Sequence, residues 1–258
     1  MTMMSRAARH REYLQALGID VYVRRGVLPP TAERDSTPEP VLDLTPDSPA
    51  TSRPTPGTGG TEAGLDWDPL VAAVAACERC ELHRTRTQTV FARGDRRARW
   101  LVVGEAPGAE EDRQGEPFVG RAGQLLDTML RALGLARGEV YIANVLKCRP
   151  PGNRDPSQDE ARLCRGYLDR QIELVDPTLI LAVGRIAAQN LLGTDSPLGK
   201  LRGRVHTLGA ARRPVVVTYH PAYLLRSPGE KRKAWADLVF ARQVFRDAGS
   251  KAPAGAVG

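Results

Sequence analysis

The sequence predicts an α/β fold in which helices cover both faces of a mainly parallel sheet of four strands. Four short apolar runs are long enough for buried strands and too short for core helices. Amphipathic helical patterns lie between these runs, and such alternation is typical of a parallel sheet flanked by helices. With 258 residues, the chain is long enough to bury a core of ordinary size.

The expected elements follow one another along the second half of the chain. The strands are expected at residues 100–103, 140–145, 178–183 and 215–219. After an apolar helical pattern at 70–76, the helices are expected at residues 123–133, 157–174, 185–192 and about 230–246. Ser157 and Glu160 have the spacing of a capping box, which marks a helix start. Gly193 is placed to end the third of these helices.

Composition divides the chain into four segments. Residues 1–27 predict a short helical extension that is too small to bury a core, so residues 1–25 are either a docking peptide for a protein partner or a flap. Residues 28–64 are rich in Pro, Ser, Thr and Gly and predict a disordered linker. The folded domain is expected over residues 65–248, and a disordered tail over 249–258.

The charge balance points to an anionic partner. The net charge is +7 and the pI is near 9.5, which favours a partner such as nucleic acid. No apolar stretch approaches the length of about 18 residues that spans a membrane. The first residues also lack the apolar core of a signal peptide. We therefore expect a soluble cytoplasmic protein without a membrane partner.

The stretch that follows the first strand, residues 104–123, is rich in Gly, Pro and acidic residues. Ligands of open parallel sheets bind at the carboxyl ends of the strands, so this loop is a candidate site. Its glycines do not have the dinucleotide-binding spacing, and its acidic residues would repel a pyrophosphate. This disfavours a nucleotide cofactor. The loop is better suited to an uncharged ligand, with Phe118 available as a stacking surface.

Polar residues follow two other predicted strands. Asn144 lies at the end of the second strand and His220 comes directly after the fourth, while the third ends at Gly184. Because parallel strands end at one edge of a sheet, these residues and the loop after residue 103 are expected to converge. Convergence of polar groups from several strands indicates a site more strongly than any one motif does.

The four cysteines fit one ligand set. They form one close pair and two single positions: Cys77, Cys80, Cys148 and Cys164. A zinc ribbon would have a second pair, and disulfides are rare in the cytoplasm. An iron–sulfur cluster suits this pattern at least as well as zinc does. Unrelated free thiols remain an alternative, because a C-x-x-C pair often occurs by chance.

Several motifs together resemble a known family. The segments CERC, GEAPGAEEDRQGEPFVGRAGQLLD, NVLKCRPPGNRDP and HPAYLLR occur in this order. They resemble the family-four uracil-DNA glycosylases, the iron–sulfur enzymes of bacteria and archaea, over residues 65–247 but not over 1–64. The resemblance implies a three-layer α/β/α sandwich with a short, mainly parallel four-stranded sheet. It also implies a [4Fe-4S] cluster on Cys77, Cys80, Cys148 and Cys164.

The activity that the resemblance implies is hydrolysis of the N-glycosidic bond of deoxyuridine in single- or double-stranded DNA. Uracil is released and an abasic site remains, the first step of base excision repair, and we expect a monomer. The flipped base would stack on Phe118. Asn144 would read its O4 and N3–H edge, and His220 would donate to the developing charge at O2. Glu105 and Ala106 would border the uracil pocket.

The resemblance leaves the water nucleophile open. Glu105, Glu111 and Asn153 are candidate catalytic residues beside His220, and no single general base is assigned. Without the family, Glu111 also fits a solvated acidic surface, Asn153 a turn and Phe118 a core position. A lone histidine such as His220 is most often a satisfied buried residue, and only its place at a strand end favours a catalytic role.

Contacts with DNA are expected directly after His220. Leu224 and Leu225 form an apolar wedge beside Arg226 that could fill the gap left by a flipped nucleotide. Lys231 and Arg232 are near enough to bind phosphates, although such a run is most often a solvated helix surface.

The sequence also allows a second function, other than that of an enzyme. The same features also suit an iron–sulfur DNA-binding module with little catalysis that is associated with replication or repair. The presence of both Asn144 and His220 favours the enzyme.

Overall fold

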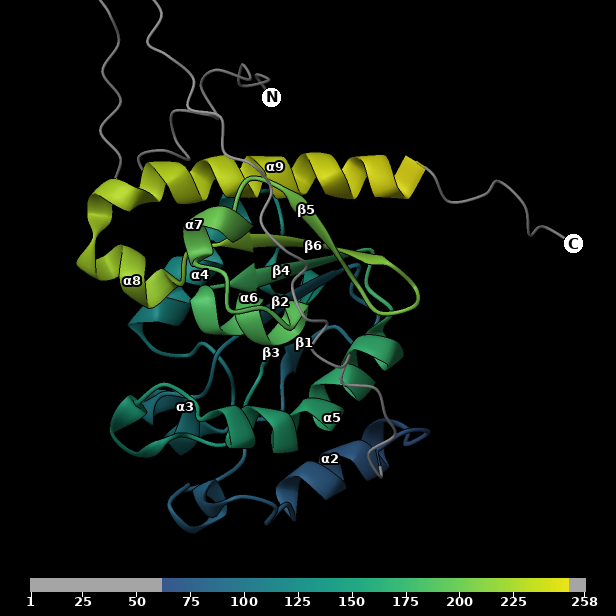
Figure 1. Ribbon diagram of the computed structural model, residues 1–258, viewed down its shortest axis with the longest axis vertical. Coiled ribbons are helices and arrows are strands. Elements are labelled where there is room, and N and C mark those ends of the chain that lie inside the picture. The colour runs from purple at the N-terminus through teal and green to yellow at the C-terminus, as the bar shows by residue number, and fades with distance from the viewer. Residues whose placement is uncertain (1–61, 251–258) are drawn as a thin grey trace, which may run out of the picture.

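The computed structural model describes residues 62–250 (Figure 1). The predicted N-terminal extension, residues 28–61 of the predicted linker and residues 251–258 of the predicted tail lie outside this range. Two boundaries differ from the prediction inside it. Glu62 is buried and forms an ion pair with Arg79, so ordered packing begins before residue 65. Gly249 and Ser250 belong to the last helix rather than to a tail.

The centre of the molecule is a mixed sheet with the strand order β1-β3-β2-β4-β6-β5 (Figure 1). Its four inner strands are parallel neighbours and match the four predicted strands. They are β2 (Trp100–Gly104), β3 (Val140–Asn144), β4 (Leu179–Val183) and β6 (Arg213–Thr218). The first three are buried along their whole length, as parallel strands covered on both faces must be.

The predicted sheet of four strands is too small, because the sheet has six. The edge strands β1 (Arg93–Gly94) and β5 (Val205–Leu208) pair antiparallel with β3 and β6. The strand β1 has only two residues, which is too short to show any periodicity. The strand β5 is half exposed at an edge, so neither strand resembles a buried apolar run. Gly94 permits the β1 pairing: its φ is 100°, and a Cβ there would lie 1.8 Å from the Val140 carbonyl oxygen.

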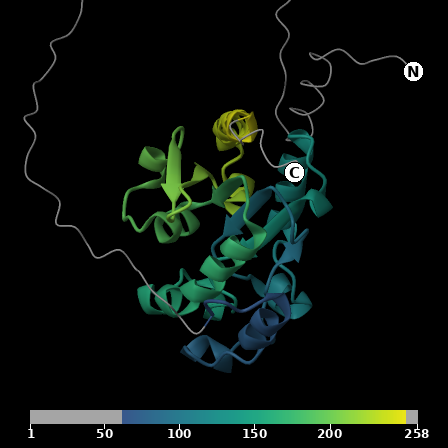
Figure 2. The same ribbon diagram turned by 90° about the vertical axis from the view of Figure 1, so that its right-hand side faces the viewer.

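Helices cover both faces of the sheet and complete the three predicted layers. One face of the sheet packs against α4 (Arg121–Ala132), α8 (Pro221–Arg226) and α9 (Lys231–Ser250). The other packs against α5 (Gln158–Val175), α6 (Arg185–Leu192) and α7 (Leu198–Leu201). Figure 2 views α9 nearly along its axis, beside the sheet. The helix α2 (Trp67–Ala75) packs outside this sandwich, with Leu70 and Val74 against Tyr167 of α5.

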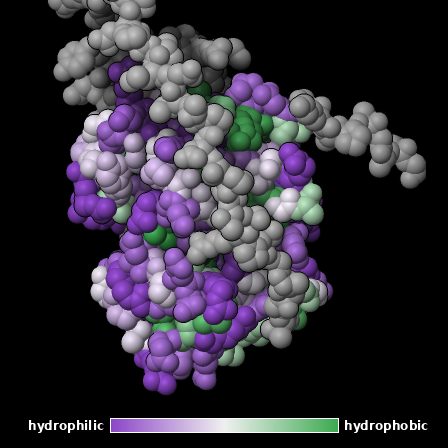
Figure 3. All heavy atoms as spheres, viewed as in Figure 1, coloured by the Kyte–Doolittle hydropathy of each residue, from purple (hydrophilic) through white to green (hydrophobic). Residues whose placement is uncertain are grey.

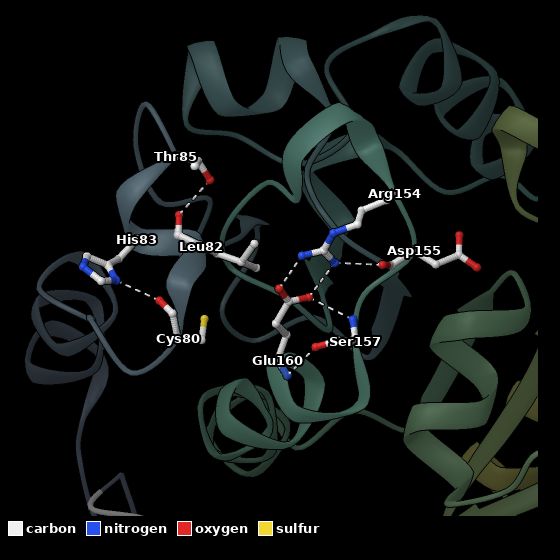
Figure 4. Close-up of polar contacts among 8 residues, drawn as sticks. All are labelled: Cys80, Leu82, His83, Thr85, Arg154, Asp155, Ser157 and Glu160. Atoms are coloured by element: carbon white, nitrogen blue, oxygen red, sulfur yellow. Dashed lines mark hydrogen bonds and ion pairs between the residues drawn. The ribbon is translucent and has the colours of Figure 1, made fainter.

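Local signals set several helix ends where the sequence places them. The Ser157 hydroxyl accepts a hydrogen bond from the Glu160 N–H at 3.1 Å, and a Glu160 carboxylate oxygen accepts one from the Ser157 N–H at 2.8 Å (Figure 4). This is the predicted capping box. Gly193 ends α6 in the left-handed region, with φ of 62°, as predicted.

Short helical elements also occur in the connections. The helix α3 (Ala109–Gln114) lies within the stretch after β2 that was predicted to be a loop. The 3-10 turns are η1 (Glu81–Arg84), η2 (Arg137–Glu139), η3 (Pro151–Asn153) and η4 (Pro228–Glu230).

The coloured part of the face drawn in Figure 3 is mostly hydrophilic. In the view of Figure 3, hydrophobic side chains form only small patches between polar ones. Within residues 62–250, no helix combines the length and the hydropathy needed to cross a membrane.

Candidate functional site

The parallel register brings four strand ends to one edge of the sheet. Gly104 of β2 pairs with Asn144 of β3, and Val183 of β4 pairs with Thr218 of β6. Glu105 therefore follows β2 beside Asn144, and His220 follows β6 beside the start of α6. The convergence predicted from the strand ends is present.

Asn144 offers an unused amide oxygen at this edge. Its side chain is 2 % exposed, and its Oδ1 has no hydrogen-bond partner within the described residues. A buried polar atom without a partner is costly, which points to a ligand that supplies a donor. Gly104 leaves the space in front of it: a Cβ there would lie 2.4 Å from the Asn144 Oδ1 and 2.6 Å from Cζ of Phe118.

Phe118 stands next to this amide in a strained backbone conformation. Its φ is 57°, which is unusual for an aromatic residue. Its ring stacks on the His220 ring, with centroids 5.7 Å apart and an angle of 30° between planes. Gly123 allows the close approach, because a Cβ there would lie 1.7 Å from the Phe118 carbonyl oxygen. The side chain is 6 % exposed, so it forms a wall of the site and part of the core at once.

Glu111 holds the loop that carries Phe118. One carboxylate oxygen accepts hydrogen bonds from the N–H groups of Val119 and Gly120 at 3.0 and 3.1 Å. The other accepts one from the Gly108 N–H at 3.1 Å, at the start of α3. Three backbone donors thus occupy the carboxylate. Glu111, one of the predicted catalytic candidates, therefore holds this loop in place. It is not part of a solvated acidic surface, and both of its oxygens already accept hydrogen bonds.

His220 is held as a neutral ring in one tautomer. Its Nδ1 accepts a hydrogen bond from the Ala222 N–H at 3.1 Å, at the start of α8, so the proton of the neutral ring is on Nε2. Burial, assisted by the nearby positive charge of Arg226, lowers the pKa of His220 to about 4. Gly184, with φ of 98°, makes room for this ring, because a Cβ there would lie 2.9 Å from the His220 Cβ.

Glu105 is a carboxyl group with a raised pKa. Burial, with a further contribution from the negative charge of Asp155, raises its pKa to about 7, and Arg185 opposes the shift. Arg185 and Asp155 form an ion pair of 2.7 Å between the start of α6 and the loop after β3. The sequence reasoning missed Arg185, although it follows the end of a predicted strand directly, which is the signal that identified His220.

Asn153 lies at the end of η3, near the surface. Its φ is 55°, and its Oδ1 accepts a hydrogen bond from the Arg149 Nε at 2.8 Å. Its amide N–H groups therefore face away from Arg149. Asn153 takes part in a turn, as the alternative interpretation of the sequence predicted. Its amide N–H groups can still donate to a ligand or a water molecule.

The predicted wedge is divided between core and surface. Leu224 is 1 % exposed and packs in the core beside α4, so its side chain does not reach DNA in this conformation. Leu225 and its neighbour Tyr223 are each 37 % exposed. Arg226 and Arg232 are exposed, and Lys231 is half-buried.

The four cysteines line one pocket with mainly apolar walls. They come from the turn just after α2, the residue before η1, the loop after β3 and the middle of α5, in the order Cys77, Cys80, Cys148 and Cys164. Among the described residues, no three Cys, His, Asp or Glu side chains are grouped to hold a single metal ion. Ala106, in the motif after β2, packs against this pocket.

Two of the thiols receive hydrogen bonds that suit thiolates. The Arg86 Nη1 donates to the Cys148 Sγ at 3.1 Å, and the Lys147 N–H donates to the Cys164 Sγ at 3.4 Å. Burial raises the pKa of Cys148 and raises that of Cys164 to about 12. Both shifts favour the protonated thiols of Cys148 and Cys164, and a bound metal centre would deprotonate them. The donor set fits a metal–sulfur group.

Lys147 joins this pocket to Asn144. Its side chain is fully buried, and its Nζ donates to the Asn144 carbonyl oxygen at 2.8 Å and to the Gln171 Oε1 at 2.5 Å. Burial lowers the pKa of Lys147 to about 8, which ionised Cys164 and Cys148 would oppose. No sequence signal distinguishes this lysine from a solvated one.

Comparisons with known proteins agree with this geometry. A family model described as the uracil DNA glycosylase superfamily matches residues 91–239. The type-4 uracil-DNA glycosylase of Archaeoglobus fulgidus is 42 % identical over 177 residues, which cover 66 % of this chain and 89 % of that protein. That of Thermotoga maritima is 45 % identical over 156 residues, 60 % of this chain and 80 % of that protein. A type-5 uracil-DNA glycosylase of Pyrobaculum aerophilum is 31 % identical over 192 residues, 61 % of this chain and 83 % of that protein.

Proposed function

This chain belongs to the uracil DNA glycosylase superfamily, and from this premise we propose that it hydrolyses the N-glycosidic bond of deoxyuridine in DNA. The reaction releases uracil and leaves an abasic site for repair. One observation carries the proposal: a neutral histidine with its proton on Nε2 stacks on Phe118, and that ring borders the same space as a buried amide oxygen that lacks a partner. Such a pair can read a uracil edge and stabilise the charge that develops on the ring.

The base would be recognised by two groups at the sheet edge. A flipped uracil stacks on Phe118, whose ring is fixed by the loop that Glu111 holds. Its N3–H donates to the Asn144 Oδ1, and its O4 accepts from the Asn144 amide. Cytosine has the opposite pattern of donors and acceptors on that edge and is rejected.

The bond would break with negative charge developing on the uracil ring. The His220 Nε2–H donates to O2 and stabilises this charge, and the ring needs no added proton to do so. Its lowered pKa keeps it neutral at physiological pH.

Water would attack the sugar carbon with help from Glu105 and Asn153. Glu105 lies at the sheet edge next to Asn144, and its raised pKa suits a proton acceptor near neutral pH. The amide donors of Asn153 could orient the same water. Glu111 contributes by fixing the loop, because its oxygens are occupied by backbone donors.

DNA would be held beside the site by α8 and the start of α9. Leu225, with Tyr223, is the exposed apolar group that could fill the gap left by the flipped nucleotide. Arg226, Lys231 and Arg232 would contact phosphates. The monomeric state, the cytoplasmic location and a partner for residues 1–25 remain predictions.

The four cysteines would hold a [4Fe-4S] cluster. The pocket that they line, and the donors on two of their sulfurs, support this assignment. The cluster would tie together α2, the loop after β3 and α5, and so order the loop that begins at Asn144. No step of the base cleavage passes through it.

A direct assay tests the proposed activity. The full chain is incubated with oligonucleotides that carry one uracil in single- or double-stranded form, and abasic sites are then cleaved by alkali. We expect cleavage at the uracil position and none with thymine or cytosine there. Tight binding to uracil-containing DNA with no cleavage in a single turnover would support the DNA-binding module instead.

We expect about four irons per chain and a brown colour in protein purified without oxygen. Cys148→Ala should lose this iron and lower the affinity for DNA, because the Lys147–Asn153 loop is no longer anchored. Metal analysis and circular dichroism of both proteins provide the measurement. One zinc per chain and no iron in the unmodified protein would contradict the cluster.

We expect the single-turnover rate to rise with pH through about 7 and then level off, because Glu105 acts only when ionised. Glu105→Gln should remove this rise. Asp155→Asn removes the negative charge that raises the pKa of Glu105, so the rise should move to lower pH. Arg185→Gln removes the opposing positive charge and should move it to higher pH. An unchanged profile in all three variants would exclude Glu105 as the titrating group.

A further inference from the structure

The most unusual charge in the described structure is the buried ammonium group of Lys147. Its side chain is among the largest that are fully buried, at 1 % exposure. Its two hydrogen-bond partners are neutral, the Asn144 carbonyl oxygen and the Gln171 Oε1. The charged neighbours of this ammonium group within residues 62–250 are Cys164 and Cys148, and no carboxylate is among them. A charge removed from water needs an opposite charge nearby, and hydrogen bonds to neutral groups compensate only part of that cost.

The groups that can supply the opposite charge are sulfurs. Cys148 is the next residue in the chain, the backbone N–H of Lys147 donates to the Cys164 Sγ at 3.4 Å, and Lys147 lines the pocket of the four cysteines. Four thiolates on an iron–sulfur core leave a net negative charge on the whole group. A cluster held by these cysteines would place negative charge in the pocket that Lys147 lines, and the Lys147 Nζ contacts the strand end that carries Asn144.

The orientation of Gln171 fixes this contact. Its Nε2 donates to the Tyr141 hydroxyl oxygen at 3.1 Å and to the Phe91 carbonyl oxygen at 3.2 Å. The amide oxygen therefore faces Lys147. Gln171 and Cys164 both belong to α5, so one helix positions a ligand of the pocket and an acceptor for the ammonium group.

We propose that Lys147 is a positioning residue that couples the four-cysteine centre to the base-reading pocket. Its ammonium group is a buried counter-ion of the anionic centre, in addition to the Arg86 guanidinium that contacts the Cys148 Sγ, and the same nitrogen fixes the carbonyl group of Asn144. This inference rests on the proposed function. It gives a role to Lys147, a residue that takes part in none of the proposed steps of base cleavage. It predicts that a change at Lys147 alters the electronic properties of the centre as well as the reading of the base.

The test uses the cluster-loaded full chain and measures its reduction potential. Lys147→Met keeps the length of the side chain and removes its charge and its donors. The oxidised centre, which is the less negative form, is then relatively favoured, so the potential should shift to a more negative value. Arg84→Met is the matched control, because Arg84 lies near Cys80 but is 68 % exposed, where solvent screens its charge. It should leave the potential unchanged.

If Lys147→Met binds no iron, its reduction potential cannot be measured, and a second variant tests the same inference. Gln171→Glu has the same shape and places a negative charge against the Lys147 Nζ. It should retain the iron and shift the potential in the same negative direction. Lys147→Met should also discriminate uracil from cytosine less well in single turnovers, because the Asn144 carbonyl group loses its donor.

The outcomes separate this inference from the proposed function. An iron-loaded Lys147→Met protein with the potential of the unmodified chain would overturn it, as would an unshifted Gln171→Glu protein. Release of uracil by the unmodified chain would leave the proposed function standing in either case. A chain that releases no uracil but shows the expected shifts would instead overturn the proposed function and keep the electrostatic role of Lys147.

Discussion

His220→Ala is expected to lower the single-turnover rate of uracil release by about 10²- to 10³-fold, the size measured for a lost oxyanion donor. Binding to DNA that carries a non-cleavable deoxyuridine analogue should change little. The donor on Nε2 is needed mainly when negative charge develops at O2, and far less by the neutral carbonyl of the ground state. Single-turnover rates and affinities, measured on the same preparation, make the comparison.

Two variants separate this effect from damage to the fold. The Nδ1 of His220 caps α8 through the Ala222 N–H, so alanine also removes a cap worth about 1 kcal/mol. His220→Asn restores a capping oxygen but provides no donor at the Nε2 position, and should be as slow as alanine. His206→Ala, on the edge strand β5, should keep the full rate. Equal losses in binding and rate for His220→Ala would show that His220 merely holds the base.

Asn144→Ala is expected to lower the rate at limiting substrate by about 10²- to 10⁴-fold, which corresponds to about 1.4 to 2.7 kcal/mol for each of two buried hydrogen bonds. The Asn144 side chain is buried and its Oδ1 lacks a partner, so water cannot easily replace it at the uracil edge. Unlike the change at His220, this change should weaken both binding and discrimination against cytosine. The ratio of single-turnover rates on uracil and cytosine oligonucleotides is the measurement.

A matched control is available in the same chain. The Asn190 Nδ2 donates to the Ile186 carbonyl oxygen within α6, away from the sheet edge. Asn190→Ala should therefore leave the rate and the discrimination unchanged. If Asn144→Ala kept its preference for uracil over cytosine, another group would have to read the base, and the assignment of Asn144 would be withdrawn.

The sequence determined the parts of this protein that depend on local pattern. Buried parallel strands need continuous apolar runs, and so the four inner strands could be located from residues alone. Connection order then placed Asn144 and His220 at one edge, because parallel strands end on the same side. The capping box at Ser157 and the glycine stop at Gly193 follow the same logic, since the backbone groups that they satisfy are only a few residues away.

Only the tertiary structure decided which side of each element faces the core. Leu224 and Leu225 are adjacent and chemically identical, yet only the packing of α8 against α4 buries the first and leaves the second exposed. The edge strands β1 and β5 form because β3 and β6 offer free edges, not because of their own periodicity.

The same holds for the electrostatics of the site. The three donors on Glu111, the tautomer of His220 and the burial of Lys147 each depend on groups brought together by folding. A local sequence pattern specifies what lies within a few residues along the chain. The charge state of a side chain depends on solvent exclusion and on neighbours distant in sequence, and these exist only once the chain is packed.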